Sequence, residues 1–415
     1  MRSAGFLGTE VELDITNVAH GGVFVARHEG RVIFVADAIP GERVRARITD
    51  DSQKSFWRAD TLEVLTPSSN RRDHIWAEAR VERDPAERPG GADFGHIALD
   101  HQRELKAFVL TDSLSRMAKI DQAVTVQSAP GDDETKGLGY RTREFLHVDE
   151  DGRVGPFASR SHRVVTVSTL PLATRRIQES APLTATIKGI QGVTLVDADS
   201  GIVALESRDK DATKAPLIMQ RVGDREFQLR ASGFWQVHRR APIVLTEAVT
   251  RAIDSQLFDP RAANLDLYGG VGLFAAAMGD AFGSTTRITS VEYDEEATEF
   301  ASNNLADWVG ARAIPGRVDH FLSDLVVSAS AVDRSRLNAA TVVLDPPRSG
   351  AGKTVVDALI ELSPSQIVYV ACDPVALARD AQLLALGGYD LAHLEAHDLF
   401  PHTHHVEAVA RFIRA

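Results

Sequence analysis

The sequence predicts an α/β protein built in three parts. Residues 236–415 are expected to form a mostly parallel, doubly wound sheet, after a small α/β domain over 69–235 and a small β-barrel over 1–68. From residue 261 onward, short apolar strands alternate with helical stretches, which indicates a parallel sheet. A glycine-rich turn follows the first of these strands. Before residue 68, short alternating runs are separated by Gly and Pro, which is typical of small barrels.

The first part reads as five or so short strands. Val11, Leu13 and Ile15 alternate along one face, and a His-Gly-Gly stretch then turns the chain. Such an OB-like barrel is either an oligonucleotide-binding module or a stable scaffold, and composition alone does not choose between them.

The middle part begins with a polar, turn-rich stretch over residues 68–93. Residues 101–120 then have helical periodicity, with Leu105, Val109 and Leu114 on one side. Residues 140–235 mix short strands with basic residues, which predicts a second α/β layer.

The last part repeats a strand–helix unit until its end. Two final strands are joined by a short histidine-rich loop, so the last strand is expected to run antiparallel to its neighbour. The expected strands are residues 262–268, 287–293, 311–316, 341–347, 366–372, 391–399 and 406–413.

Composition and charge narrow the function classes. No apolar run reaches the roughly 18 residues of a membrane span, and the first residues lack the apolar core of a signal peptide, so a cytoplasmic protein without a membrane partner is expected. Net charge is −12, although residues 136–176 hold 8 Lys/Arg against 4 Asp/Glu. That basic stretch either attracts RNA or is an ordinary solvated face.

The turn after the first strand of the last part matches G-x-G-x-x-A. The pattern is formed by Gly270, Gly272 and Ala275, and its glycines let a ligand approach the backbone closely. Glu292 ends the next strand at the spacing used for ribose hydroxyls. The pattern suits NAD and S-adenosylmethionine equally. Asp345, in an Asp-Pro-Pro stretch at the end of the fourth strand, favours a methyl donor because a dehydrogenase has no need of it.

Cys372 is the single cysteine, so no disulfide or cysteine-ligated metal is possible within one chain. It ends a strand just before a helix, whose N-terminus is expected to favour the thiolate. A thiolate that adds to C6 of uridine activates C5 toward methylation, and a base must then remove the C5 proton. Candidates for that base lie in the histidine-rich loop up to Glu407, which begins an apolar strand, where a carboxylate is costly unless it is used or paired.

Taken together, these stretches resemble the bacterial RNA uridine C5-methyltransferases that carry an N-terminal TRAM domain. The resemblance implies a class I methyltransferase fold, an RNA-binding middle domain, S-adenosylmethionine as cofactor, an rRNA or tRNA substrate with 23S rRNA favoured, and a monomer. It implies Cys372 as nucleophile and Glu407 as base, with Gln236, Tyr268, Gly270, Gly272, Glu292 and Asp345 at the cofactor and Arg348 and His405 at the substrate. The matching stretches are GFWQVH, DLYGGVGLFA, VEYDEEATEFASNNL, LDPPRSGAG, ACDP and DLFPHTHHVEAVA.

Some positions depart from the family pattern. Many members bind an iron–sulfur cluster through cysteines, where this chain has Pro89-Gly90-Gly91-Ala92, so no cluster and no other metal site is expected. Asp373 follows the nucleophile where the family often has Asn. Leu273 and Arg317 replace a polar and an acidic residue expected near the cofactor.

Three other functions compete with uridine methylation. Another RNA target such as cytosine C5 is disfavoured by the Cys–Glu pair, and a non-catalytic RNA-binding assembly factor by the retention of nucleophile, base and cofactor residues. An NAD-dependent oxidoreductase rests on the glycine pattern alone.

Overall fold

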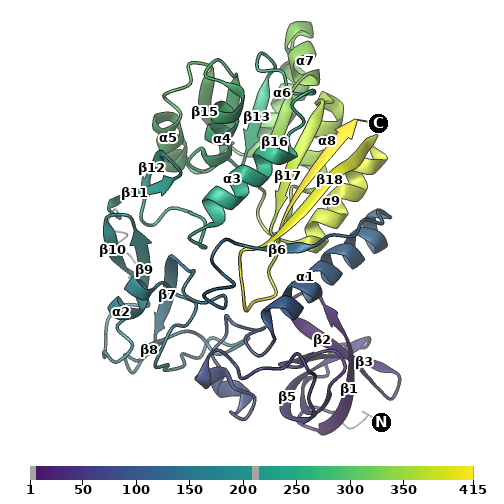
Figure 1. The fold of residues 1–415 in the computed structure, drawn as a ribbon, viewed down its shortest axis with the longest axis vertical. Coiled ribbons are helices and arrows are strands. Elements are labelled where there is room, and N and C mark those ends of the chain that lie inside the picture. The colour runs from purple at the N-terminus through teal and green to yellow at the C-terminus, as the bar shows by residue number, and fades with distance from the viewer. Residues whose placement is uncertain (1–5, 208–214, 415) are drawn as a thin grey trace.

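A computed structural model describes residues 6–207 and 215–414 (Figure 1). The chain begins with a closed barrel of five strands, in the order β1-β2-β3-β5-β4. Alternate residues point into the barrel, where Leu13, Ile15 and Ile33 are at most 3% exposed. The predicted barrel is therefore confirmed. Its strands are β1 Glu10–Ala19, β2 Val23–His28, β3 Arg31–Ala36, β4 Arg43–Asp50 and β5 Phe56–Thr66.

The middle segment begins with a stretch that holds two short 3-10 turns, Ala77–Ala79 and Pro85–Glu87. One long helix follows, α1 (Leu99–Ser113), which continues as a π-helical turn over Leu114–Ala118. This helix agrees with the predicted periodicity. A four-stranded sheet follows, in the order β10-β9-β7-β8, with α2 (Arg175–Ser180) beside it. Its strands are β7 Arg143–Val148, β8 Val154–Gly155, β9 Gly192–Ala198 and β10 Gly201–Ser207. A hairpin of β11 (Leu217–Val222) and β12 (Arg225–Arg230) completes the segment.

The C-terminal part is built on an eight-stranded sheet, in the order β15-β14-β13-β16-β17-β19-β18-β6. The first five strands are mutually parallel, and β19 runs antiparallel to both β17 and β18, as predicted. The strands are β13 Asn264–Leu267, β14 Ile288–Glu292, β15 Ala311–Pro315, β16 Thr341–Leu344, β17 Gln366–Ala371, β18 Tyr389–Asp398 and β19 Glu407–Arg414.

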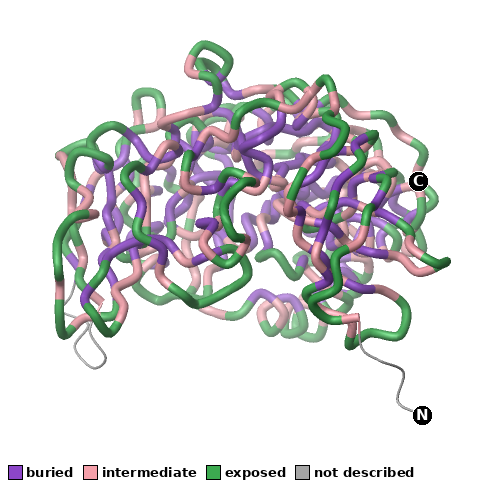
Figure 2. The backbone as a smooth tube through the Cα atoms, turned by 90° about the horizontal axis from the view of Figure 1, so that it is seen from below, coloured by how far each residue is buried: buried purple, intermediate pink, exposed green. Residues whose placement is uncertain are grey.

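Helices cover both faces of this sheet and make two apolar cores. Val343, Val368 and Val370 face α3 and α4, while Val342, Ile367 and Tyr369 face α8 and α9. Figure 2 shows the buried segments running through the interior, with exposed segments confined to the surface. The helices are α3 Ala241–Ala252, α4 Leu273–Phe282, α5 Glu295–Asn304, α6 Val318–Ser328, α7 Ala331–Asn338, α8 Gly352–Leu362 and α9 Pro374–Leu386.

The eighth strand of the sheet comes from far upstream. β6 (Val126–Ser128) pairs parallel with β18, and α1 packs against α9. On the other side, Phe227 and Leu229 of the β11–β12 hairpin belong to the core beneath α3 and α4. Parts of the middle segment thus complete the C-terminal sheet and its core, and the proposed domain limits at residues 68 and 235 stay a prediction.

The order of the strands fixes where a ligand can bind. β14 and β15 lie on one side of β13, whereas β16 and β17 lie on the other. The sheet therefore changes winding direction between β13 and β16, and the loops at the carboxyl ends of these strands leave a crevice. Among the helices of the described residues, none has the length and apolar content that crossing a membrane requires.

Candidate active site

The glycine turn after β13 is held in a conformation that favours glycine. Gly270 has φ +52° and Gly272, which precedes α4, has φ +91°; Tyr268 is also left-handed, with φ +62°. A Cβ atom on Gly269 would lie 2.0 Å from the hydroxyl of Ser290, whereas one on Gly270 would meet no atom within 4 Å. The turn packs tightly against the sheet on one side and is open on the other, where a ligand can approach the backbone.

Glu292 stands at the end of β14, where the sequence predicts it. Its Oε2 accepts a hydrogen bond from the backbone N–H of Gly270 at 3.0 Å, and its Oε1 accepts one from the N–H of Asp294 at 2.9 Å. These bonds fix the carboxylate at the rim of the crevice and leave acceptor capacity for hydroxyl groups.

Beneath the turn, Asp266 has no contact with solvent. Its Oδ2 accepts hydrogen bonds from Ser290 Oγ at 3.0 Å and from the N–H of Ala275 at 3.3 Å. Burial raises the pKa of Asp266 to about 7, because few groups nearby compensate the charge. This residue ties β13, β14 and α4 together, a role that the sequence analysis did not assign to it.

Cys372 follows directly after β17, and Glu407 is the first residue of the neighbouring strand β19. Ala371 of β17 pairs with Ala408 of β19 in an antiparallel ladder, so the next pair of positions holds Cys372 and Glu407. Directly opposed residues in such a ladder have Cα atoms about 4.5–5.5 Å apart. Asp345 follows β16, the neighbour of β17 on its other side. The topology therefore gathers a thiol and two carboxyl groups at one place.

The cavity at this place has a volume of about 580 Å³. Of the ten site residues that the sequence predicts, Gly272 alone is not part of its wall. Leu229 and Arg230 of the β11–β12 hairpin also line it, which the sequence analysis did not foresee. The predicted residues in the wall are Gln236, Tyr268, Gly270, Glu292, Asp345, Arg348, Cys372, His405 and Glu407.

The acidity of Cys372 differs from the sequence-based prediction. Cys372 does precede α9, yet its pKa is raised to about 12, chiefly by burial and then by the charges of Glu407 and Asp345. Only Arg348 among its stronger neighbours opposes this shift. The expectation that a position just before a helix favours the thiolate of Cys372 is therefore wrong, since burial and the neighbouring carboxylates favour the protonated thiol.

Both carboxyl groups also hold their protons more tightly than usual. Glu407 is 5% exposed, and burial together with the charge of Asp345 raises its pKa well above the ordinary value. Burial, followed by the charge of Asp266, raises the pKa of Asp345 to about 7. No described residue donates a hydrogen bond to the Asp345 side chain, so this carboxylate has free acceptor capacity at the cavity wall.

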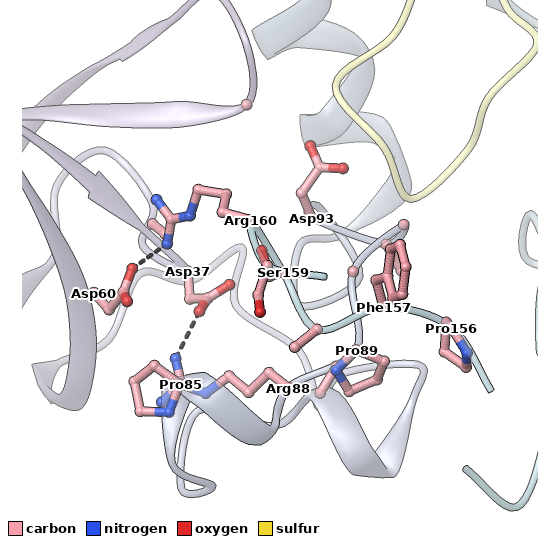
Figure 3. A pocket seen from close by; sticks show the side chains of 18 of the residues that line it. Asp37, Asp60, Pro85, Arg88, Pro89, Asp93, Pro156, Phe157, Ser159 and Arg160 are labelled. Atoms are coloured by element: carbon pink, nitrogen blue, oxygen red, sulfur yellow. Dashed lines mark hydrogen bonds and ion pairs between the residues drawn. The ribbon is translucent and has the colours of Figure 1, made fainter. Parts of the chain in front are cut away.

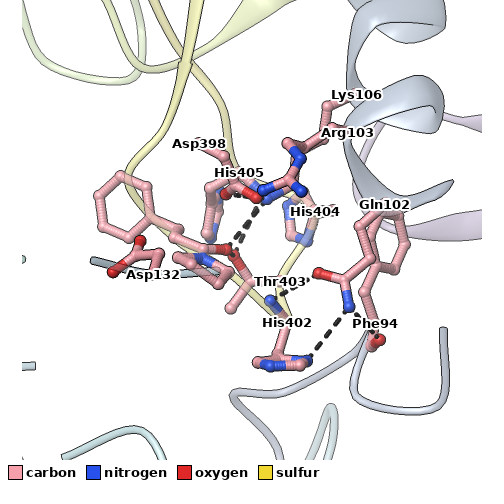
Figure 4. Close-up of polar contacts among 12 residues, drawn as sticks. Phe94, Gln102, Arg103, Lys106, Asp132, Asp398, His402, Thr403, His404 and His405 are labelled. Carbon is pink, nitrogen blue, oxygen red and sulfur yellow. Dashed lines mark hydrogen bonds and ion pairs between the residues drawn. The ribbon is translucent and has the colours of Figure 1, made fainter. Parts of the chain in front are cut away.

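The loop before Glu407 is anchored by α1, as Figure 4 shows. Gln102 accepts a hydrogen bond from the N–H of His402 at 2.7 Å and donates to its Nδ1 at 3.1 Å. The other ring nitrogen of His402 donates to the carbonyl of Lys136 at 2.8 Å. One helical turn further along α1, Lys106 Nζ lies 2.5 Å from Asp398 Oδ1 and 3.0 Å from the carbonyl oxygen of Phe400.

The three histidines of this loop have different surroundings. His402 is buried, which lowers its pKa to about 4, and its role is to hold the loop. His404 Nδ1 lies 2.6 Å from Asp93 Oδ2, whereas His405 Nε2 lies 3.3 Å from Arg348 Nη2 at the cavity. In the described part of the chain, no group of three or more His, Cys, Asp or Glu is placed to hold a metal ion.

Comparison with known proteins gives this geometry a family. A family model described as tRNA (Uracil-5-)-methyltransferase matches residues 220–414, and the TRAM domain matches residues 6–56. An uncharacterised RNA methyltransferase of Streptomyces coelicolor is 35% identical over 97% of this chain and 93% of its own. The chain belongs to the TRAM-containing RNA uracil-C5 methyltransferases. It is accordingly an S-adenosylmethionine-dependent enzyme that acts on RNA.

Two further relatives of this methyltransferase are informative. The 23S rRNA (uracil(1939)-C(5))-methyltransferase RlmD of Shewanella sediminis is 28% identical over 98% of this chain and 96% of its own. The tRNA (uracil-54, C5)-methyltransferase of Pyrococcus abyssi, solved with S-adenosyl-L-homocysteine, covers 97% of this chain and 100% of its own with a TM-score of 0.69. At 20% identity, the latter likeness concerns the fold.

The site fits the methyltransferase cofactor. The open glycine turn at Gly270, the oriented carboxylate of Glu292 and the unpartnered carboxylate of Asp345 line one side of the cavity that reaches Cys372. Neither Leu273 nor Arg317, the two departures near the cofactor, is part of the cavity wall; Arg317 instead pairs with Asp319 at 2.8 Å.

Residues 89–92, which the resemblance sets against the cluster cysteines of other members, line a separate groove of about 460 Å³ between the barrel and the middle sheet (Figure 3). Pro89 forms a bridge with Ala158, and the N–H of Gly90 donates to the carbonyl of Phe157 at 2.9 Å. Arg88, 3% exposed, binds Asp37 at 2.6 Å and several backbone carbonyls. Backbone pairing and one buried arginine thus hold this stretch.

Proposed function

We propose that this methyltransferase transfers a methyl group to C5 of a uridine in 23S rRNA, through a covalent bond between Cys372 and C6. The observation that carries the proposal is the register of β17 and β19, which sets Cys372 opposite Glu407 at one cavity with Asp345. A thiol and a carboxyl group on the same side of a cavity can reach C6 and C5 of one pyrimidine ring.

The chain's residues divide the work as follows. The thiolate of Cys372 adds to C6, and the C5–C6 electron pair becomes nucleophilic at C5. S-adenosylmethionine supplies the methyl group from a positively charged sulfonium. Glu407 then takes the C5 proton, the C5=C6 bond forms again, and the thiolate leaves. A raised pKa makes the ionised form of Glu407 a strong base for that proton.

Further residues position the two ligands. Gln236, Tyr268, Gly270, Gly272, Glu292 and Asp345 are proposed for the cofactor. Arg348 and His405 contact each other at the cavity mouth and are proposed for the target nucleotide. Arg348 also offsets part of the negative charge around Cys372. The target base has to leave its stack to reach Cys372, as in other enzymes that act on bases.

Support for 23S rRNA comes from the relative in Shewanella sediminis, whose name states that substrate. We also propose that the protein is a monomer and that it works in the cytoplasm, as expected from the sequence.

The substrate is tested with RNA that carries tritium at C5 of uridine. Unmodified 23S rRNA and tRNA transcripts are incubated with the enzyme and S-adenosylmethionine, and we expect one equivalent of tritium to be released from 23S rRNA. Release from tRNA alone would move the proposal to tRNA. Release from C5-tritiated cytidine in place of uridine would overturn the uridine assignment.

A further inference from the structure

The barrel reaches the catalytic loop through the turn between β1 and β2. Val18, Ala19, His20 and Gly21 of the barrel line a small cavity of about 130 Å³, and its opposite wall contains Arg348, Cys372 and Asp373. Cys372 therefore faces two cavities, one on the cofactor side and one beneath the barrel.

His20 forms the direct link across this cavity. Its Nε2 lies 2.8 Å from Asp373 Oδ2, although the two residues are 353 positions apart in the chain. Asp373 Oδ1 accepts a hydrogen bond from the N–H of Ala376 at 2.8 Å and so caps α9. Both oxygens of Asp373 are thus held, one by the helix and one by the barrel, directly after Cys372.

The turn that carries His20 is itself fixed from the other side. Gly22 has φ +73°, and a Cβ atom at this position would lie 2.3 Å from Asp93 Oδ2 and 2.8 Å from His404 Nδ1. Glycine therefore lets the turn press against the Asp93–His404 pair. The turn is wedged between two His–Asp contacts, so His20 is oriented before any substrate arrives.

We propose that His20 is a positioning residue for the methyl transfer: it holds Asp373 and thereby sets the loop that carries Cys372, which makes the barrel part of the active site. The role of Cys372 as nucleophile rests on the function proposed above.

The contact between His20 and Asp373 also affects the electric charge near the thiol. Asp373 is among the carboxylates that raise the pKa of Cys372, with Glu407 and Asp345, while Arg348 lowers it. A protonated His20 offsets the charge of Asp373.

Because Cys372 is the chain's single cysteine, alkylation by iodoacetamide reports on this thiol alone. The experiment compares full-length wild type with His20→Ala, His20→Gln, Asp373→Asn and the double variant His20→Ala, Asp373→Asn. His28→Ala is the matched control, since His28 also lies on the barrel and makes no contact with the catalytic half among the described residues. Alkylation is followed against pH without RNA, and kcat and KM are measured with RNA.

We expect His20→Ala to slow alkylation about threefold or more at a fixed pH and to lower kcat about tenfold, with KM for S-adenosylmethionine within twofold. His20→Gln keeps a donor and should restore most of kcat. In the Asp373→Asn background, loss of His20 should no longer move the alkylation profile, because the charge it offsets is gone.

An alkylation profile and kcat for His20→Ala that match His28→Ala would overturn the proposal. A lowered kcat with an unchanged alkylation profile, when His20→Ala is introduced into wild type and into Asp373→Asn, would also overturn the proposal. That pattern indicates general loosening of the fold. If Cys372→Ser still methylates RNA, the nucleophile assignment fails, whereas the alkylation result for His20 is unaffected.

Discussion

Three acidic groups, Cys372, Asp345 and Glu407, line the cavity of the site together with Arg348. Burial raises the pKa of all three groups. The charge of Asp345 raises the pKa values of Glu407 and Cys372 further, and Arg348 opposes the shift at those two. Each of these groups therefore holds its proton more tightly than the same group does in water. A positive charge brought beside these groups lowers all three pKa values, which couples readiness for chemistry to the arrival of the methyl donor.

This coupling predicts how Cys372 reacts with iodoacetamide. The thiolate is the reactive form, so alkylation of the free protein should be slow at neutral pH and accelerate as pH rises toward about 12. S-adenosylmethionine should give an alkylation rate about three- to tenfold above that with S-adenosylhomocysteine, because its sulfonium charge lowers the pKa of the thiol. S-adenosylhomocysteine fills nearly the same space with a neutral thioether and therefore serves as the control. Equal rates with the two ligands would show that the sulfonium charge does not reach the thiol.

Asp345 should make the stability of the free protein depend on pH. Its pKa is raised to about 7, so the folded state binds a proton that the unfolded chain releases near pH 4. That contribution is complete below about pH 4 and is lost as pH rises through about 7. In wild type, the free energy of unfolding should fall as pH rises from about 4 to above 7. Asp345→Asn should make that fall smaller by up to about 4 kcal/mol.

Chemical denaturation at pH 4, 6 and 8 measures this effect. Asp390→Asn, at an exposed position on β18, serves as the control. The same pH dependence in wild type and Asp345→Asn would contradict the prediction.

At the scale of elements, the catalytic strand β19 depends on a helix from far upstream. α1 holds the loop before Glu407 through Gln102 and Lys106, and Lys106 and Asp398 are 0% and 1% exposed. A buried pair loses little when both members are replaced by apolar groups, but removal of one member strands a charge. The contacts around the π-helical turn at the end of α1 do not explain why it forms.

Lys106→Met should therefore destabilise the protein by about 3–5 kcal/mol and lower kcat, because Asp398 loses its partner and the loop its anchor. The double variant Lys106→Met, Asp398→Leu should recover much of the stability. Lys353→Met, which removes an exposed lysine paired with Asp357, should change it by less than about 1 kcal/mol. A Lys106→Met protein with wild-type unfolding midpoint would refute this account of the anchor.

The elements also show what the sequence can predict. Strands, helices and the glycine turn depend on neighbours within a few residues, so local periodicity located β13 to β19 and the residues Gly270, Glu292, Asp345 and Cys372. β6 has three residues and joins β18 some 270 positions away, and no local pattern reports such a contact. The same limit hid the His20–Asp373 contact and the buried Lys106. The thiol pKa was mispredicted because burial comes from residues distant in sequence.

At the scale of the whole molecule, we expect the barrel to contribute positive charge to RNA binding. Three of its six strand arginines are used internally, since Arg43, Arg45 and Arg47 pair with glutamates on neighbouring strands. Arg27 and Arg31 have no carboxylate partner among the described residues, and Arg31 lies over the Trp57 ring at 4.5 Å. Free guanidinium groups of this kind are the ones that bind phosphates.

Arg27→Glu and Arg31→Glu should weaken RNA binding about tenfold each and lower the slope of log affinity against log salt by about one. Arg47→Ala is the control, because Arg47 already pairs with Glu10. Binding is measured from 50 to 300 mM salt. Over this range, the loss of roughly one phosphate contact changes the slope of log affinity against log salt enough to be detected. Loss of affinity in Arg47→Ala equal to that in Arg27→Glu would assign the effect to barrel stability.

The covalent mechanism itself is tested most directly by Glu407→Gln. Addition of Cys372 to C6 and transfer of the methyl group precede removal of the C5 proton, whereas release of the thiolate follows it. Glutamine keeps the size of Glu407 but cannot take the proton. The account predicts a denaturant-resistant protein–RNA band that carries labelled methyl, absent in the double variant Cys372→Ser, Glu407→Gln. Normal turnover by Glu407→Gln, or the same band in the double variant, would contradict it.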